Sequence, residues 1–191
     1  MSEFNKDHDN FSTNFSLKDF TSILIGIYFL VAAYGIQFIL DGFLIDGNVM
    51  GMMSVEIIEV LIIVIVFFLF LFSSLALFFK GKRVAKKFHY KLWNGKTKAI
   101  FWKYLIGNLL LFCVLLLLLN KGHVNYITPS FLLFYGILLF LLKNKKRKDL
   151  LILSLISILL AILCILIPTY WYSSLCILGI AHISFGIVVR K

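Results

Sequence analysis

Charged residues are scarce in this sequence. Asp, Glu, Lys and Arg together make up 15% of its 191 residues, and 61% of the residues are hydrophobic. A typical soluble domain is roughly a quarter charged and half apolar. A soluble fold of this length has too little interior to bury so much apolar surface. The composition therefore argues against an ordinary water-soluble domain and favours a membrane protein.

Cysteine and proline are also rare. The three cysteines, Cys113, Cys164 and Cys176, lie within apolar segments and show no C-x-x-C spacing, so they indicate neither a disulfide framework nor a zinc site. We expect all three to be small hydrophobic residues of the core. The two prolines, Pro129 and Pro168, fall at the ends of apolar segments. No predicted span is therefore broken at its centre, as happens in many ion-coupled transporters.

Motifs that mark known chemistries are missing as well. The sequence has no Gly-rich phosphate loop, no H-E-x-x-H and no G-x-S-x-G, and no nucleophile stands beside an obvious base. We therefore expect no catalytic residues, no metal and no cofactor. The first twenty residues are polar and mildly acidic, without the short basic start of a secretory signal. We expect no cleavable signal peptide.

Long apolar blocks are what the sequence does contain. Blocks of about 18 or more residues with few or no charges predict membrane-spanning helices. Six blocks can be drawn, and at 1.5 Å per residue the shortest is about 25 Å long. Their bounds are 21–40, 55–79, 99–119, 126–142, 150–167 and 171–189. The predicted fold is all-α, a polytopic membrane protein with one bundle of six transmembrane helices over residues 21–191, after a flexible cytoplasmic tail over residues 1–20.

Positive charge is distributed unevenly along the chain. Eight basic residues lie in residues 80–98 and five in residues 143–148, and six alternating spans place 18 on one face and only Lys121 on the other. The positive-inside rule then puts the basic loops and both termini in the cytoplasm, in a cell (inner or plasma) membrane. Aromatic residues at the predicted boundaries, such as Tyr126 outside and Trp102 inside, fit the role of interfacial anchors.

The basic loop over residues 80–98 has a pattern of its own, in which apolar residues recur at helical spacing. The residues expected to contact lipid are Lys82, Arg83, Lys86, Lys87, Lys91 and Trp93. The pattern predicts a short helix in the headgroup layer, where each cation near an anionic leaflet contributes about 1 kcal/mol. An irregular loop that only fixes orientation is the alternative. We expect anionic headgroups as the partner and no nucleic acid, because one basic loop is not a nucleic-acid-binding fold.

Few polar residues lie inside the predicted spans, and they are His182, Asn108 and Gln37. Such groups are unfavourable in hydrocarbon and usually have partners. His182 shares a helix face with Gly179 and Gly186, and small residues let a neighbouring backbone approach, so we expect His182 to face another helix. Counted from the cytoplasmic end, His182 and Asn108 lie about 12 and 13 Å deep, which would allow a hydrogen bond if their helices touch. These residues are either packing contacts or candidates for a ligand or proton path.

Four acidic residues gather on the predicted outer side, Asp41, Asp46, Glu56 and Glu59. Glu56 and Glu59 are three positions apart and share a helix face. With Lys121 as the single basic residue on that side, the four acids are candidates for attracting a cation. The loop among them offers no obvious rigid shell for a metal site, and solvation at the interface is the alternative explanation.

Small side chains recur at three- and four-residue spacing in two of the predicted spans. In the fifth span they are Ser154, Ser157, Ala161 and Cys164, and a similar line in the first span is Gly26, Ala33 and Gln37. Small residues let membrane helices pack closely. We interpret the line in the fifth span as a helix–helix seam and not as a catalytic row.

Three functions are compatible with these features. The favoured one is a non-enzymatic accessory, scaffold or assembly protein that binds other membrane subunits, a second copy of itself, or lipid. The second is a small transporter or channel with His182, Asn108 and Gln37 as its polar path. The third is an enzyme that acts on lipid at the cytoplasmic face, with lysine or arginine holding the headgroup.

Overall fold

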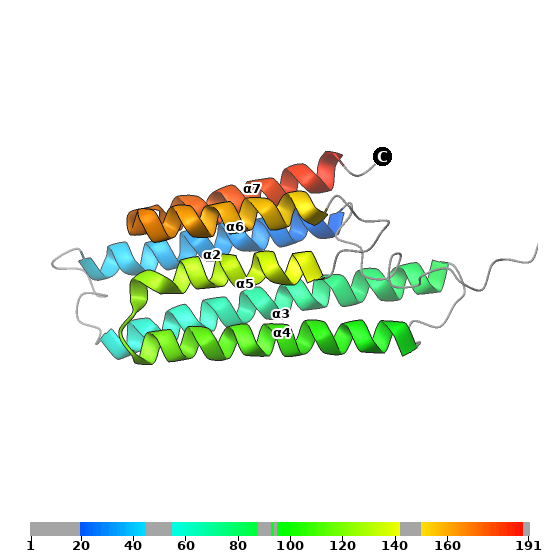
Figure 1. Cartoon of the computed structure of the whole chain (residues 1–191), viewed down its shortest axis with the longest axis horizontal. Helices are drawn as coiled ribbons and strands as arrows, with labels where there is room; N and C mark the ends of the chain where they lie inside the picture. The colour runs from blue at the N-terminus through cyan, green and yellow to red at the C-terminus, as the bar shows by residue number, and fades with distance from the viewer. Residues whose placement is uncertain (1–19, 45–54, 88–92, 94, 142–149, 189–191) are drawn as a thin grey trace, which may run out of the picture.

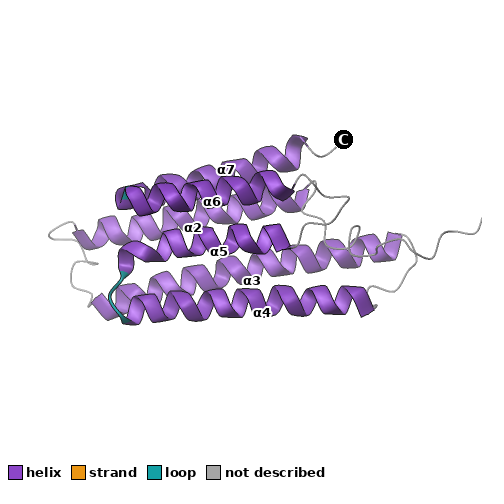
Figure 2. Cartoon of the chain, viewed as in Figure 1, coloured by secondary structure: helices purple, strands orange, loops and turns teal. Residues whose placement is uncertain are grey.

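The computed structural model describes residues 20–44, 55–87, 93, 95–141 and 150–188, and all regular structure within them is helical (Figure 2). The long helices are α2 (Phe20–Leu44), α3 (Val55–Lys87), α4 (Gly95–Asn120), α5 (Ile127–Leu141), α6 (Leu150–Leu166) and α7 (Trp171–Val188). Two short 3₁₀ helices, η2 (Val124–Tyr126) and η3 (Pro168–Tyr170), precede α5 and α7. The six long helices correspond to the six predicted apolar blocks, which confirms the all-α class.

The helices form a bundle in which neighbours along the chain are neighbours in space. Each helix packs against the one before it and the one after it, and α7 returns to pack against α2, which closes a ring. The α2–α7 and α5–α6 pairs have the most extensive contact, and α3 and α4 touch each other least. Short connections favour this antiparallel order. Figure 1 shows that α2 begins, α3 ends, α4 begins and α7 ends at the same end of the bundle. We call it the basic end, because Lys86 and Lys87 lie there in the last turn of α3.

Four of the helices in the described part of the chain are long and apolar enough to cross a membrane. They cover Phe20–Gly42, Ile57–Lys87, Phe101–Asn120 and Pro168–Val188. The apolar helices α5 and α6 have 15 and 17 residues, which corresponds to about 22 to 26 Å at 1.5 Å per residue. Length and composition therefore support four of the six predicted spans directly, and the two shorter helices lie beside them in the same bundle.

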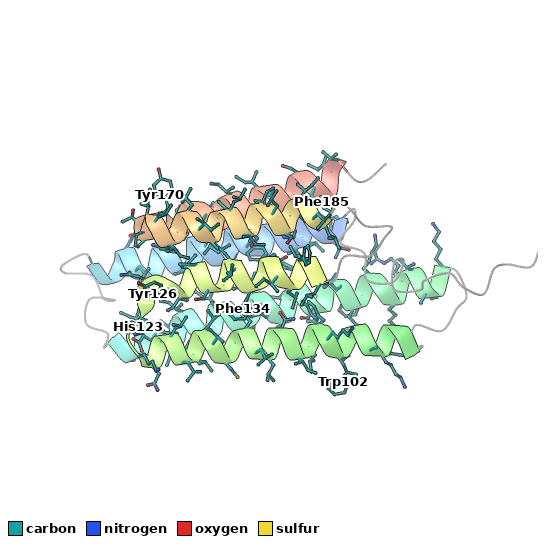
Figure 3. All side chains as sticks on the ribbon, viewed as in Figure 1. Trp102, His123, Tyr126, Phe134, Tyr170 and Phe185 are labelled. Carbon is teal, nitrogen blue, oxygen red and sulfur yellow. The ribbon has the colours of Figure 1, made fainter. Side chains whose placement is uncertain are left out.

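The outer surface of the bundle is apolar on every helix. Phe67 on α3, Leu109 on α4 and Ile180 on α7 are 50%, 61% and 56% exposed, and similar residues occur along all six helices. Soluble monomers rarely expose apolar patches larger than a few hundred Å². The aromatic residues Tyr126 and Tyr170 lie at one end of the bundle, while Trp102 points outward nearer the other (Figure 3). This surface is that of a membrane-associated protein.

The structure corrects the interpretation of the basic loop. The residues Lys82, Arg83, Lys86 and Lys87 belong to the last turns of α3 and are exposed there. They continue a long helix instead of forming a separate short one. Ala85, one of the apolar residues of the pattern, is buried on this extension. Lys91 lies outside the described residues, and Trp93 packs edge-on against Phe101.

The helices α2 and α7 approach each other closely where Gly26 faces Gly179. A Cβ atom added at Gly26 would lie 2.5 Å from the carbonyl oxygen of Gly179, and one added at Gly179 would lie 2.9 Å from that of Gly26. Only glycine leaves enough room for two backbones at this distance. The expectation that small residues around His182 admit a neighbouring helix is therefore confirmed, and the neighbour is α2.

The seam predicted on the fifth span is also confirmed, because its four small residues are buried on α6. The Ser154 hydroxyl donates to the carbonyl of Gly136 at 2.7 Å, and the Ser157 hydroxyl donates to that of Leu132 at 2.6 Å. Both carbonyls belong to α5, so these bonds tie α6 to α5.

The cysteines do not all share the predicted environment. Cys164 is buried on α6 and donates to the Ser174 hydroxyl of α7 at 3.1 Å. Cys176 is partly buried, and Cys113 is exposed. The prediction of three core cysteines is therefore wrong for Cys113, because the outer surface of this bundle is as apolar as its core and composition does not separate the two.

Candidate functional site

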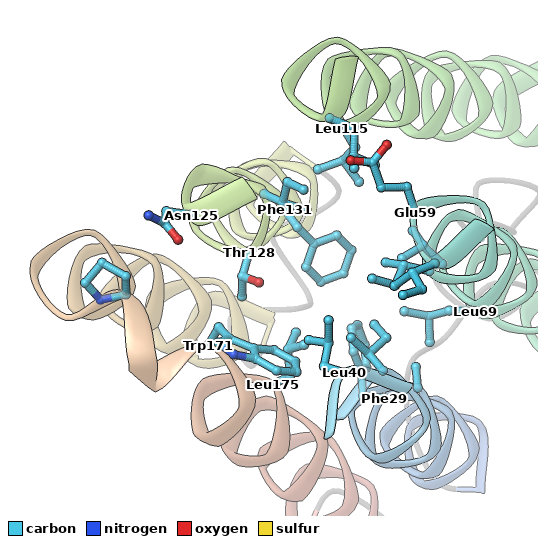
Figure 4. A pocket seen from close by; sticks show the side chains of 18 residues that line it. Phe29, Leu40, Glu59, Leu69, Leu115, Asn125, Thr128, Phe131, Trp171 and Leu175 are labelled. Carbon is cyan, nitrogen blue, oxygen red and sulfur yellow. The ribbon is translucent and has the colours of Figure 1, made fainter. Parts of the chain in front are cut away.

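A cavity of about 300 Å³ lies inside the ring of helices, at the end opposite the basic end. It is lined by side chains of α2, α3, α4, α5 and α7 (Figure 4). Its apolar lining includes Phe29, Ala32, Ile36, Leu40, Ile58, Ile62, Val66, Leu69, Leu115, Leu119, Ile127, Phe131, Trp171 and Leu175. This volume is at the lower end of the range of about 300 to 1,000 Å³ that small-molecule sites occupy.

The cavity exists because small side chains and sparse helix contact leave space in this part of the bundle. Ala32 places a single methyl group where the neighbouring lining positions of α2 carry large side chains. The sparse contact between α3 and α4 leaves those two helices without close packing across this wall. The helix α7 begins only after η3, whose Pro168 also lines the cavity. A small residue and a loosely packed helix pair together leave a cavity that the side chains present do not fill.

Three polar side chains also line the cavity: Glu59 on α3, Asn125 in η2 and Thr128 on α5. Glu59 is half-buried, and in Figure 4 its carboxylate points from α3 toward Leu115 on α4. Asn125 and Thr128 approach from the side of α5, across the cavity from Glu59 (Figure 4). Among the described residues that line the cavity, Glu59 is thus the one that carries a charge.

Aromatic rings form one side of the cavity wall. The rings of Phe29 and Phe131, both in the lining, have centroids 5.8 Å apart. Phe29 also meets the ring of Tyr135 edge-on at 5.3 Å and stacks on the imidazole of His182 at 5.6 Å. Tyr135 and His182 are not among the lining residues, so this aromatic layer separates the cavity from a buried histidine.

His182 is fully buried and joins three helices. Its Nε2 lies 2.9 Å from the Tyr135 hydroxyl of α5, and its Nδ1 lies 3.2 Å from the Ser22 hydroxyl of α2. Ser22 donates its one proton to the backbone carbonyl of His182 at 2.8 Å. Because a hydroxyl has a single proton to give, Ser22 can only accept from Nδ1–H, which places a proton on Nδ1. In the neutral form of the imidazole, Nε2 then accepts from the Tyr135 hydroxyl, and both ring nitrogens have a hydrogen-bond partner.

Asn108 does not pair with His182. It hydrogen-bonds the Tyr104 hydroxyl on its own helix, which also contacts the Ser74 hydroxyl of α3 at 3.3 Å. The sequence was right that both residues have polar partners, but the bond it allowed between them is not formed.

Gln37 lies apart from this group. Its amide donates to the Asp41 carboxylate, one turn along α2, at 2.7 Å, and Asp41 is exposed. The three residues of the suggested polar path, His182, Asn108 and Gln37, are therefore not brought together in one place.

Of the two outer acids whose side chains the structure describes, Asp41 and Glu59, it is Glu59 that lines the cavity. Asp46 and the side chain of Glu56 lie outside the described residues, and Asp41 is hydrogen-bonded to Gln37. Among the residues that the structure describes, no three His, Cys, Asp or Glu side chains gather in a way that would hold a metal ion. The acids thus appear as one cavity residue and one surface residue in the described part of the chain.

Sequence reasoning missed several residues of this region. Ser22 and Tyr135 hold His182, and Phe29 covers it, yet each resembles many other residues of its type in the sequence. The Ser73 hydroxyl is buried without a hydrogen-bond partner among the described residues. A serine in an apolar span is a weak signal by itself, because its hydroxyl commonly bonds its own helix.

Comparisons of this chain with protein-family models, with curated proteins and with solved structures return no match.

Proposed function

We propose that this chain is a non-enzymatic polytopic membrane protein that binds one apolar chain of a lipid or other amphiphile in its cavity. One observation carries the proposal: an apolar cavity of about 300 Å³ sits inside a bundle whose outer surface is also apolar. Its largely apolar lining offers water few hydrogen-bond partners. In a membrane the nearest molecules that can fill it are hydrocarbon chains.

The proposed arrangement is six spans with both termini in the cytoplasm. The uneven placement of 18 basic residues supports it, as does the arrangement of the described helices, which begin and finish at the basic end (Figure 1). The exposed cations at the end of α3 would then reach anionic headgroups of the inner leaflet. The cavity would lie toward the outer leaflet, and the exposed apolar faces of α3 and α4 would contact lipid, partner subunits or a second copy.

The transporter and enzyme alternatives have less support. A polar path needs His182, Asn108 and Gln37 to line one route, whereas each has a partner in a different place. A lipid-modifying site would also need an acid or a histidine near the basic loop, such as His89, and this residue lies outside the described residues, so the structure does not test that alternative. Binding is the function that the geometry favours.

The orientation can be tested by labelling single cysteines in intact cells. In a background with Cys113, Cys164 and Cys176 changed to serine, a membrane-impermeant maleimide should label Asn125→Cys without permeabilisation. It should label Lys96→Cys only after permeabilisation, because the positive-inside rule places that residue in the cytoplasm. The opposite pattern, or equal labelling of both from outside, would refute the proposed orientation.

The cavity can be tested through Trp171, which lines it. With Trp93 and Trp102 changed to phenylalanine, Trp171 is the single tryptophan. We expect an ω-bromoalkyl alcohol added to the protein in micelles to quench its fluorescence. Ala32→Phe should reduce this quenching several-fold, since the added ring fills the cavity.

The matched control is Val31→Phe, which adds the same ring one position away, where the side chain is 65% exposed on the outer surface. It should leave the quenching unchanged. Leu115→Phe fills the cavity from α4 and provides a second test if Ala32→Phe does not fold. Equal quenching in the filled variants and in Val31→Phe would mean that the bromine reaches Trp171 only from the micelle, and the proposal of a chain-binding cavity would fail.

A further inference from the structure

We infer that the cavity selects a single-chain amphiphile with a cationic ammonium head, which Glu59 binds. This inference rests on the proposed function and names the ligand class of the same site. Its starting point is that an apolar cavity in a membrane has little preference of its own. A hydrocarbon chain that moves from the bilayer into the cavity leaves one apolar environment for another, so the hydrophobic effect scarcely favours the transfer. Selection must come from the polar end of the ligand.

Glu59 is the group at the cavity that can provide that selection. It is half-buried, it lines the cavity, and no ion pair joins it to a described residue. A carboxylate at an apolar wall is stabilised by an opposite charge, because it has lost part of its water. The other polar side chains of the wall, Asn125 and Thr128, carry no charge and lie across the cavity (Figure 4).

The chain itself offers little positive charge at this end. Residues 41–54 contain no lysine or arginine, and Lys121 is the one basic residue of the remaining connections on this side. Lys121 is exposed, as is His123 two positions later. The charge that complements Glu59 is therefore expected to come from a ligand.

Size and charge together define the ligand. A volume of about 300 Å³ suits one alkyl chain and not two. An ammonium group carries up to three hydrogen-bond donors and a positive charge, and charge-assisted hydrogen bonds to a carboxylate are stronger than neutral ones. A long-chain amine fits both properties, whereas a fatty acid of the same length would place two negative charges together.

The test compares three ω-bromoalkyl probes of equal chain length that carry an amine, a hydroxyl or a carboxylate. Quenching of Trp171 in the single-tryptophan protein gives an affinity for each. We expect the amine to bind about tenfold more tightly than the alcohol, a difference of about 1.4 kcal/mol, and the carboxylate to bind most weakly. Glu59→Gln should bring the amine down to the affinity of the alcohol and leave the alcohol unchanged.

The control is Asp41→Asn, which removes an exposed acid at the same end that is hydrogen-bonded to Gln37. It should keep the preference for the amine. Equal affinities for the three probes, or an amine preference that survives Glu59→Gln, would overturn the inference while chain binding itself stands. Stronger quenching by a phospholipid with brominated chains and an ethanolamine head would overturn the single-chain assignment. Equal quenching of Trp171 in Ala32→Phe and in Val31→Phe would instead reject the proposed function.

Discussion

Gly26→Ala is expected to separate α2 from α7 and to destabilise the bundle by about 1 to 3 kcal/mol, the usual range for overpacking. The added methyl group would meet the carbonyl oxygen of Gly179 at 2.5 Å and the Cγ1 atom of Ile183 at 2.7 Å. The oxygen belongs to helix backbone and cannot rotate aside, so the helices must move apart. Thermal unfolding in micelles, followed by circular dichroism, measures the loss.

The matched control is Gly95→Ala at the start of α4, where an added Cβ has no atom within 4 Å. Alanine is favoured over glycine in a helix interior by about 1 kcal/mol. Propensity alone would therefore make both variants as stable as the parent or slightly more stable. A Gly26→Ala protein that unfolds at the same temperature as Gly95→Ala would show that the close approach of α2 and α7 is not required.

His182→Phe is the second substitution with a large expected effect. It retains a flat ring in contact with Phe29 but removes both ring nitrogens, which leaves the Tyr135 hydroxyl without its acceptor. An unsatisfied buried polar group costs about 1 to 3 kcal/mol, so we expect a loss of stability of that size. Unfolding in micelles is again the measurement, and His123→Phe, at an exposed position, is the control.

Combining His182→Phe with Tyr135→Phe tests the hydrogen bond between the two side chains. Once His182 has become phenylalanine, removal of the Tyr135 hydroxyl takes away the group that was left unsatisfied. The double variant should therefore be more stable than His182→Phe alone, and a double-mutant cycle measures the coupling. Additive losses for the two substitutions would contradict the hydrogen bond between Nε2 and the Tyr135 hydroxyl.

The sequence predicted the helices well because long apolar blocks carry a strong signal. Every predicted block corresponds to a helix, and the main difference is at α3, which continues to Lys87. The change from apolar to basic residues after Phe79 predicts the end of the span, followed by either a separate interfacial helix or an irregular loop. A helix continues across such a change in composition unless a residue such as proline or glycine stops it, and Gly81 alone did not.

Individual contacts were predicted only where small residues marked them. The seam formed by Ser154 and Ser157 was recognisable because serine at that spacing is unusual in an apolar span. The partners of His182 were not recognisable, since Ser22 is 160 positions away in the sequence and Tyr135 is 47 positions away. Asn108 lies at a matching depth but on α4, which is not adjacent to α7 in the ring.

By itself, the sequence determined that these segments are helices, that they alternate in direction, and that positive charge gathers at one end. These properties depend on composition along the chain, which the order of residues records directly. The tertiary structure alone decided which faces meet, that His182 is held between Ser22 and Tyr135, and that a cavity opens beside Glu59. The physical reason is that a helix apolar on all sides has no preferred face, so its rotation is set by packing against neighbours, and only the assembled ring shows where packing is incomplete.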